Sequence, residues 1–273
     1  MHLDSHVHFW QYNPDEYPWI DDTMTPLRRD FMPEDALGMM QPAGMDGCVA
    51  VQVRQTLDET RWLLQLADRH AFIAGVVGWV DLRSDDLGAQ IESVAHPKLV
   101  GVRHIVQAEP DDFLLDERFR RGVARLARHG LAYDILIYAR QMPAAIAFAS
   151  RLPDGRLVLD HLGKPDIKRE GFDSWRRDLE RMAAIPNVCA KLSGLVTEAD
   201  WSRWTIEDLH RYVNAAIDAF GPDRLMFGSD WPVCTLAARY GEVIDIIQTA
   251  IDGRPQTEQD SILGGTARRF WSL

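Results

Sequence analysis

Two histidines near the start of the chain have a spacing that would let them act together. His6 and His8 are separated by one residue, and Asp4 lies two positions before them. Alternate side chains of a β-strand share one face, so these three would point the same way. Neutral imidazoles arranged like this can hold one metal ion between them. A lone His-x-His pair is weak evidence, because two partly exposed histidines are the ordinary alternative.

Two later segments also end in groups that could do chemistry. The apolar run 157–159 is followed by Asp160 and His161, and the apolar run 225–227 is followed within three residues by Asp230. Taken singly, Asp230 could cap a helix or a turn, and His161 could be a structural histidine in a loop. Four such groups, the two early histidines included, at the ends of three apolar runs favour one shared site.

The elements that must position these groups are visible as short apolar or β-branched runs. Eight runs predict strands, at residues 2–8, 47–53, 72–79, 99–106, 131–137, 156–161, 187–193 and 224–230. Amphipathic stretches between them predict helices, at Leu57–His70, Asp86–Ala95, Glu117–His129, Met142–Leu152, Trp175–Ile185, Ile206–Phe220 and Tyr240–Ile251.

This alternation indicates a parallel sheet with right-handed crossovers. Eight strand–helix units can close on themselves, and 273 residues is a usual length for that architecture. We therefore predict an α/β fold with a single domain over residues 1–273, a distorted (β/α)₈ TIM-type barrel. A doubly wound open sheet is the alternative. In a barrel the catalytic groups lie at the carboxyl ends of the strands, which is where His6, His161 and Asp230 fall.

Two long segments interrupt the alternation. Residues 9–33 follow the first predicted strand, are rich in aromatic residues and contain four prolines. We predict that this loop lies over the barrel mouth as an aromatic wall or lid, with simple packing onto the barrel as the alternative. Residues 194–205 form a second such loop with two tryptophans. Residues 257–263 begin like a capped helix and are predicted to close the bottom or side of the barrel.

Composition limits the partners. The net charge of −11 argues against binding to nucleic acid through a basic surface, and no apolar run is long enough to span a bilayer. The N-terminus shows no secretory signal, and three widely separated cysteines fit a reduced, cytoplasmic protein. A homo-oligomer is compatible with the sequence, which does not give the oligomeric state.

Short motifs spread over the whole chain carry a resemblance to a known family. They are Asp4–Trp10, Leu27–Phe31, Gly101–His104, Asp160–Pro165, Lys191–Gly194, Phe227–Pro232 and Gly264–Ala267. As a set, and in this order, they resemble the metal-dependent amidohydrolase superfamily, in the branch that contains sugar-lactone and other lactone hydrolases. The resemblance implies a distorted barrel and hydrolysis of a cyclic ester or a related bond.

The resemblance also implies roles for the residues that match. His6 and His8 match the paired histidines of the first strand, His161 the histidine of the sixth, and Asp230 the late aspartate that transfers protons and often binds metal. Residues 102–107 lack the lysine or glutamate that bridges two metals, and residues 131–138 lack a histidine. We therefore expect one divalent ion, zinc, with His6, His8 and Asp230 as ligands. Members of the branch differ in whether metal is needed for turnover.

The chemistry of lactone hydrolysis suits these groups. Asp230 is the predicted general base, and in its protonated form it could return the proton to the leaving alkoxide. A metal ion would lower the pKa of bound water or polarise the carbonyl. His161, helped by Lys164 or Arg103, could donate to the carbonyl oxygen. Without a metal, His6 and His8 would become hydrogen-bond donors.

Other polar and aromatic side chains near the strand ends could bind the substrate. Alternation puts Arg103 and Gln107 on one face and His104 on the other, and an ion pair between Arg103 and Asp134 is the structural alternative. Two tryptophans offer faces on which a sugar ring could stack. The predicted substrate-binding residues are Trp10, Arg103, His104, Tyr138, Lys164 and Trp231.

The sequence thus predicts an enzyme, a cytoplasmic hydrolase that acts on the carboxylic ester bond of a small sugar lactone, an aldonolactone. A zinc-dependent decarboxylase of the same superfamily is one alternative. A lactonase for a dicarboxylate lactone is another, and its paired arginines could come from Arg28 and Arg29. A non-catalytic carbohydrate-binding barrel is the more distant alternative.

Overall fold

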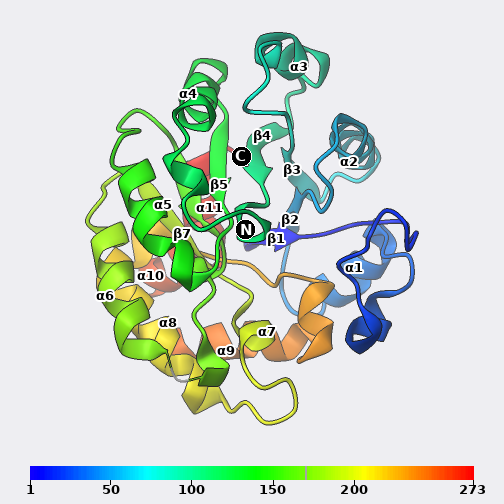
Figure 1. Ribbon diagram of the computed structural model, residues 1–273. Coiled ribbons are helices and arrows are strands. Elements are labelled where there is room, and N and C mark those ends of the chain that lie inside the picture. The colour runs from blue at the N-terminus through cyan, green and yellow to red at the C-terminus, as the bar shows by residue number, and fades with distance from the viewer. Residues whose placement is uncertain (170) are drawn as a thin grey trace.

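Eight parallel strands form the centre of the molecule in the computed structural model, which describes residues 1–169 and 171–273 (Figure 1). Every strand lies inside its predicted range, so the eight strand predictions are confirmed. The strands are β1 Leu3–Val7, β2 Gly47–Val51, β3 Ile73–Gly78, β4 Leu99–His104, β5 Ala132–Ile135, β6 Leu157–Leu159, β7 Val188–Leu192 and β8 Leu225–Phe227.

The order of the strands decides between the two candidate architectures. Each strand pairs in parallel with the next one along the chain, from β1 to β8. Within the described residues the ring is completed by an isolated parallel bridge between Val7 and Trp231. A doubly wound sheet needs a reversal of strand order, which this sequential order excludes. The nearly closed ring confirms the distorted (β/α)₈ barrel.

Helices surround the ring of strands (Figure 1). Seven correspond to the seven predicted helices, with ends that differ by three residues or fewer: α2 Leu57–Arg69, α3 Leu87–Ser93, α4 Glu117–Leu126, α5 Met142–Ala149, α6 Phe172–Ala183, α8 Ile206–Phe220 and α9 Tyr240–Ile251. Three of these helices, α2, α4 and α8, begin after a residue whose side chain accepts from a backbone N–H of the first turn. Thr205, for example, accepts from the backbone N–H of Asp208 before α8. Among the described helices, none is long and apolar enough to cross a membrane.

Shorter helices were not predicted, because one or two turns show too little periodicity to be recognised. They include α1 Pro33–Met40, which begins at the last residue of the first long loop, and α7 Leu195–Glu198, which lies near the start of the second. The first loop itself is ordered by a 3₁₀ helix, Asp22–Leu27, and by an antiparallel bridge between Trp10 and Phe31.

The end of the chain closes one end of the barrel. Helices α10 Gln256–Asp260 and α11 Thr266–Trp271 flank a π-helical turn, and Figure 1 shows α11 behind the strands. A Cβ at Gly264 would lie only 2.6 Å from the backbone nitrogen of Leu3, so this turn can approach β1 only as glycine. The predicted cap at the start of residues 257–263 is wrong, because α10 begins at Gln256 after Pro255 and Thr257 lies inside the helix. It is α11, beyond that segment, that packs on an apolar interior cluster: Leu3, Val49, Val51, Val77, Val100, Ala132, Val158, Met226, Ala267 and Trp271.

Candidate active site

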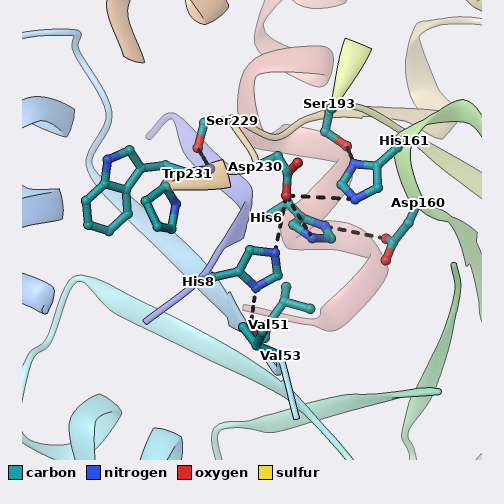
Figure 2. A network of polar contacts seen from close by, with 12 residues as sticks. His6, His8, Val51, Val53, Asp160, His161, Ser193, Ser229, Asp230 and Trp231 are labelled. Carbon is teal, nitrogen blue, oxygen red and sulfur yellow. Dashed lines mark hydrogen bonds and ion pairs between the residues drawn. The ribbon is translucent and has the colours of Figure 1, made fainter. Parts of the chain in front are cut away.

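Three imidazoles meet one carboxylate oxygen at the carboxyl ends of β1, β6 and β8 (Figure 2). The Oδ1 atom of Asp230 lies 3.2 Å from Nε2 of His8, 3.8 Å from Nε2 of His6 and 3.9 Å from Nε2 of His161. All four side chains are buried. The structure therefore brings together the four residues that the sequence singled out, and we call them the His–Asp cluster.

Asp4 holds β1 and β8 in the register that this cluster needs. Its Oδ1 accepts from the backbone N–H groups of His6, at 3.0 Å, and Ser229, at 2.9 Å, while the Tyr240 hydroxyl donates to Oδ2 at 3.0 Å. Burial raises the pKa of Asp4 to about 6, and the hydrogen bonds from Ser229 and His6 oppose that rise. Asp4, the first residue of the Asp-x-His-x-His motif, thus supports His6 and His8, which belong to the cluster.

Two cluster residues have strained backbones. His161 has φ 53° and Asp230 has φ 58°, a left-handed conformation that residues other than glycine rarely adopt. Such strain collects at functional sites, where the surrounding fold holds a side chain in a required direction. Gly194 makes room for His161, because a Cβ on it would lie 2.6 Å from the Nδ1 atom of that ring.

Each ring has an outer partner on its Nδ1 atom, so its Nε2 atom is turned to the cluster. His8 Nδ1 donates to the carbonyl oxygen of Val51 at 2.8 Å, and His161 Nδ1 lies 2.8 Å from the hydroxyl of Ser193. His6 Nδ1 lies 3.5 Å from Oδ1 of Asp160 (Figure 2). Backbone carbonyls and carboxylates in this position fix the tautomer of metal-binding histidines.

The donor set fits a divalent metal ion. Among the described residues, His6, His161 and Asp230 bring one ligand atom each to within 4.8 Å of one another. Two imidazoles and a carboxylate are ligands that zinc accepts in sites with an open position. His161 thus belongs to the candidate ligand group, although the sequence suggested His8, whose Nε2 instead contacts the Asp230 carboxylate directly.

The electrostatics keep the rings of His6 and His161 neutral and the Asp230 carboxylate charged. Burial alone would raise the pKa of Asp230, but the rings of His161, His8 and His6 lower it below its usual value. Burial lowers the pKa of His161 to about 4, against the opposing influence of Asp230. Burial also lowers the pKa of His6 well below its usual value, and the charge of Lys191 adds to this. At neutral pH Asp230 can therefore accept a proton.

A layer of buried charges lies beneath the cluster. Lys191 on β7 pairs with Asp134 at 2.5 Å and with Asp160 at 2.9 Å, and Arg103 on β4 pairs with Asp160 at 3.1 Å. All of these side chains are at most 3% exposed. The suggested ion pair between Arg103 and Asp134 is therefore not formed, although the two residues are neighbours in register, because Lys191 takes the Asp134 carboxylate.

A cavity of about 300 Å³ opens over the cluster at the barrel mouth. Polar groups and an apolar wall share its lining: His8, Gln55, Arg103, Gln107, His161 and Lys164 with Trp19, Val53, Ile105, Ala108, Leu136 and Val233. The loop 9–33 contributes Trp19, whose side chain is 38% exposed. This is the size and mixture expected for a small-molecule site.

Comparison with known proteins gives the family. The profile described as "Amidohydrolase" matches residues 3–273, nearly the whole chain. The chain belongs to the amidohydrolase family. This agrees with the resemblance seen in the sequence motifs.

Relatives of this amidohydrolase are similar over most of their length. An L-fucono-1,5-lactonase of Burkholderia multivorans is 44% identical, over 100% of this chain and 96% of that protein. One of Burkholderia ambifaria is 41% identical, over 88% of this chain and 83% of that protein. A crystal structure of an amidohydrolase from Burkholderia multivorans with bound zinc is 43% identical, with a TM-score of 0.98, over 100% of this chain and 99% of that one.

Of the predicted substrate-binding residues, the amidohydrolase barrel brings Arg103 and Lys164 to the cavity. Trp10 and Trp231 are at most 2% exposed and pack edge-to-face on Phe31, so neither offers a face to a ligand. Tyr138 borders a neighbouring hollow that Lys164 also lines.

His104 is also kept away from the cavity. Its ring stacks on Phe113 with centroids 5.1 Å apart, and its Nε2 contacts Glu109 at 2.9 Å. The cause is strand alternation, which turns Arg103 inward and His104 outward.

Several residues of the site were given no role from the sequence. Ser193 orients His161, Asp160 lies behind His6, and Trp19 lines the cavity. Asp160 and Ser193 lie at the ends of predicted strands, and this position could have marked them as site residues. Nothing in the local sequence separates Trp19 from the buried Trp10, since burial depends on how the loop folds back on the barrel.

Proposed function

We propose that this amidohydrolase hydrolyses a small sugar lactone to the open-chain sugar acid. The observation that carries the proposal is the ionised Asp230 carboxylate, set among three imidazoles, two of which, His8 and His161, line the cavity at the barrel mouth. The similarity to two L-fucono-1,5-lactonases, over 88% or more of this chain, supports the substrate class.

The reaction uses the cluster twice. Asp230 removes a proton from water as the oxygen attacks the lactone carbonyl, and the carbonyl oxygen gains negative charge. Without metal, Ser193 can donate to Nδ1 of His161, and the proton on Nε2 can then be donated to that oxygen. With zinc bound, the Nε2 lone pair would go to the ion, which would supply the stabilising charge instead. When the tetrahedral intermediate collapses, the ring C–O bond breaks and the protonated Asp230 returns its proton to the alkoxide. The products are a hydroxyl and a carboxylic acid on one open chain, and the acid releases its proton to solvent to become a carboxylate.

A divalent ion fits the same site. We propose zinc, held by His6, His161 and Asp230, because these donors suit it and a 43% identical structure contains it. When bound, zinc would supply positive charge that polarises the carbonyl and lowers the pKa of water.

The charges of the cavity wall favour a neutral polyhydroxylated ring over a dicarboxylate. Arg103 is occupied by Asp160 and by the backbone oxygen of Gln52, and Lys164 is paired with Glu198 at 3.3 Å. The loop arginines do not supply a clamp. Arg28 pairs with Asp22 at 2.8 Å, and Arg29 lies over the ring of Phe31. The dicarboxylate alternative therefore lacks the free arginines that it needs among the described residues.

Two groups on the wall suit a sugar. The buried Oε1 atom of Gln107 has no hydrogen-bond partner among the described residues, so a substrate hydroxyl could donate to it. Trp19 offers the exposed aromatic face that Trp10 and Trp231 lack. We assign the ring face to Trp19 and one hydroxyl to Gln107.

The decarboxylase alternative is not favoured, because two relatives more than 40% identical to this chain are named as lactonases. A non-catalytic barrel would have no use for a carboxylate whose pKa is lowered by three imidazoles. We also propose a reducing cytoplasmic location, because all three cysteines are free. Self-association stays a prediction.

The test is a pH-indicator screen over a panel of sugar lactones, run with and without a chelator. Acid release from at least one aldonolactone is expected, and activity on no lactone would contradict the proposal. Full activity after verified metal removal would contradict only the catalytic use of zinc. Release of carbon dioxide from an aromatic acid would instead favour the decarboxylase.

A further inference from the structure

His6 is contacted by a cationic side chain at each of its two ring nitrogens. Arg103 Nη1 lies 3.1 Å from Nε2, and Lys191 Nζ lies 3.1 Å from Nδ1. A neutral imidazole carries one N–H and one lone pair, so it can accept a hydrogen bond from only one of these cations. The other cation must be satisfied elsewhere.

The surroundings of the ring decide which contact is the hydrogen bond. Lys191 already has two carboxylate acceptors, Asp134 at 2.5 Å and Asp160 at 2.9 Å. The Nδ1 atom also lies 3.5 Å from Asp160 Oδ1, the same oxygen that Lys191 contacts at 2.9 Å, and a carboxylate oxygen has a lone pair for each of them. A proton on Nδ1 is therefore accommodated, and the lone pair of Nε2 is left for Arg103.

That lone pair is the one a metal ion would need. His6 Nε2 is the ring nitrogen nearest to Asp230, at 3.8 Å, on the side where the candidate ligand atoms gather. Arg103 is held there firmly, because its guanidinium also donates to Asp160 at 3.1 Å and to the backbone oxygen of Gln52. A guanidinium stays charged at any ordinary pH, so it also repels a second cation.

We propose that Arg103 is a resident cation that competes with a divalent metal ion for the Nε2 lone pair of His6. The inference rests on the site of the proposed function, but it concerns metal affinity and not turnover. Arg103 would thus limit how often the site holds a metal ion, because the ion can bind only when the hydrogen bond from Arg103 Nη1 to His6 is broken.

The test compares two variants that each remove one positive charge from the cavity wall. Arg103→Met loses the contact with His6, whereas Lys164→Met loses a charge that is paired with Glu198 and does not contact His6. Zinc affinity of the metal-stripped full chain is measured by competition with a chromophoric chelator. A charge-assisted hydrogen bond accounts for roughly tenfold or more in affinity, so Arg103→Met should bind zinc at least about tenfold more tightly than the parent. Lys164→Met should stay within about threefold.

Unchanged or weaker zinc binding by Arg103→Met would overturn the proposal. An equal gain in Lys164→Met would overturn it too, since the effect would then be one of general charge. If Arg103→Met does not fold, ¹⁵N spectra of histidine-labelled parent protein give the tautomer of His6, assigned with His6→Gln. A proton on Nδ1 is expected without metal, and a proton on Nε2 would refute the competition.

The two proposals can fail separately. A protein that hydrolyses no lactone but shows tighter zinc binding in Arg103→Met keeps this inference and loses the proposed function. The opposite result keeps the lactonase and removes Arg103 from the control of metal binding.

Discussion

The Oδ1 atom of Asp230 lies 3.2 Å from the Nε2 atom of His8, although 222 residues separate them in the chain. Two backbone hydrogen bonds enforce this closeness, from Asp230 N to His6 O at 2.9 Å and from His8 N to Trp231 O at 2.7 Å. The carboxylate therefore sits among the imidazoles because β1 and the end of β8 are neighbours where the barrel closes.

Replacement of Asp230 by Asn should abolish most turnover while the protein stays folded. The amide cannot accept the proton of water, and loss of a general base costs roughly 10²- to 10⁴-fold in rate. Lactone hydrolysis and thermal unfolding are measured together, with Asp58→Asn on the exposed face of α2 as the control. Unaltered hydrolysis by folded Asp230→Asn would contradict the assignment.

Replacement of Ser193 by Ala should lower the turnover number by about tenfold, because outer partners of this kind are worth roughly 10- to 100-fold. The hydroxyl orients His161 through a 2.8 Å contact with Nδ1. Ser202→Ala is the matched control, since that hydroxyl is paired with the surface residue Asp200. Equal kinetics in the two variants would show that Ser193 has no part in positioning.

The pH profile should show an acid limb well below the usual range of histidine. Burial lowers the pKa of His161 to about 4, so the ring stays neutral above that value and gains a proton as the pH falls through it. The specificity constant kcat/KM should be level from pH 6 to pH 5 and fall near pH 4, as measured within the range where the protein stays folded. A limb centred near about pH 6.5, the ordinary value, would contradict this.

Glu59 should make the protein less stable as the pH rises. Burial raises its pKa from 4.5 to about 7, against the hydrogen bonds from Arg54 and Val53. A raised carboxyl pKa stabilises the fold below pH 4.5, and this contribution is lost as the pH rises through 7.

In Glu59→Gln this change should be absent. From pH 5 to pH 8, the free energy of unfolding of the parent should fall by about 3 kcal/mol relative to the variant. Urea unfolding of both proteins at the two pH values measures the difference, in which the other buried carboxyls cancel. Parallel behaviour of the two proteins would show that Glu59 is not the cause.

Replacement of Gln107 by Leu should weaken binding of a lactone whose hydroxyl donates to the free Oε1 atom. KM should rise by about tenfold for that lactone and change little for the deoxy analogue that lacks the hydroxyl. The pair of substrates is the control, because a general disturbance of the cavity would raise KM for both. An equal rise in KM for both substrates would show that Gln107 does not accept a hydrogen bond from a substrate hydroxyl.

The barrel could be predicted because its signals are local. Each strand is a short run of apolar residues, and each long helix repeats its apolar positions at a helical period. The alternation of strands and helices can therefore be recognised from the sequence. His6, His161 and Asp230 could be placed at one mouth because carboxyl ends of parallel strands gather at the same end of a barrel. The short helices α1 and α7 lacked such a period and were missed.

The sequence by itself thus determined the barrel, its family and the four side chains of the His–Asp cluster, since strand alternation and chain order are written in neighbouring residues. Only the tertiary structure decided which charges pair and which aromatic rings are free. Lys191 takes Asp134 and leaves Arg103 for Asp160 and His6. Trp19 lines the cavity, whereas Trp10 is fully buried. These outcomes depend on distances of a few ångströms between segments far apart in the chain, where only one partner can occupy each acceptor or each gap.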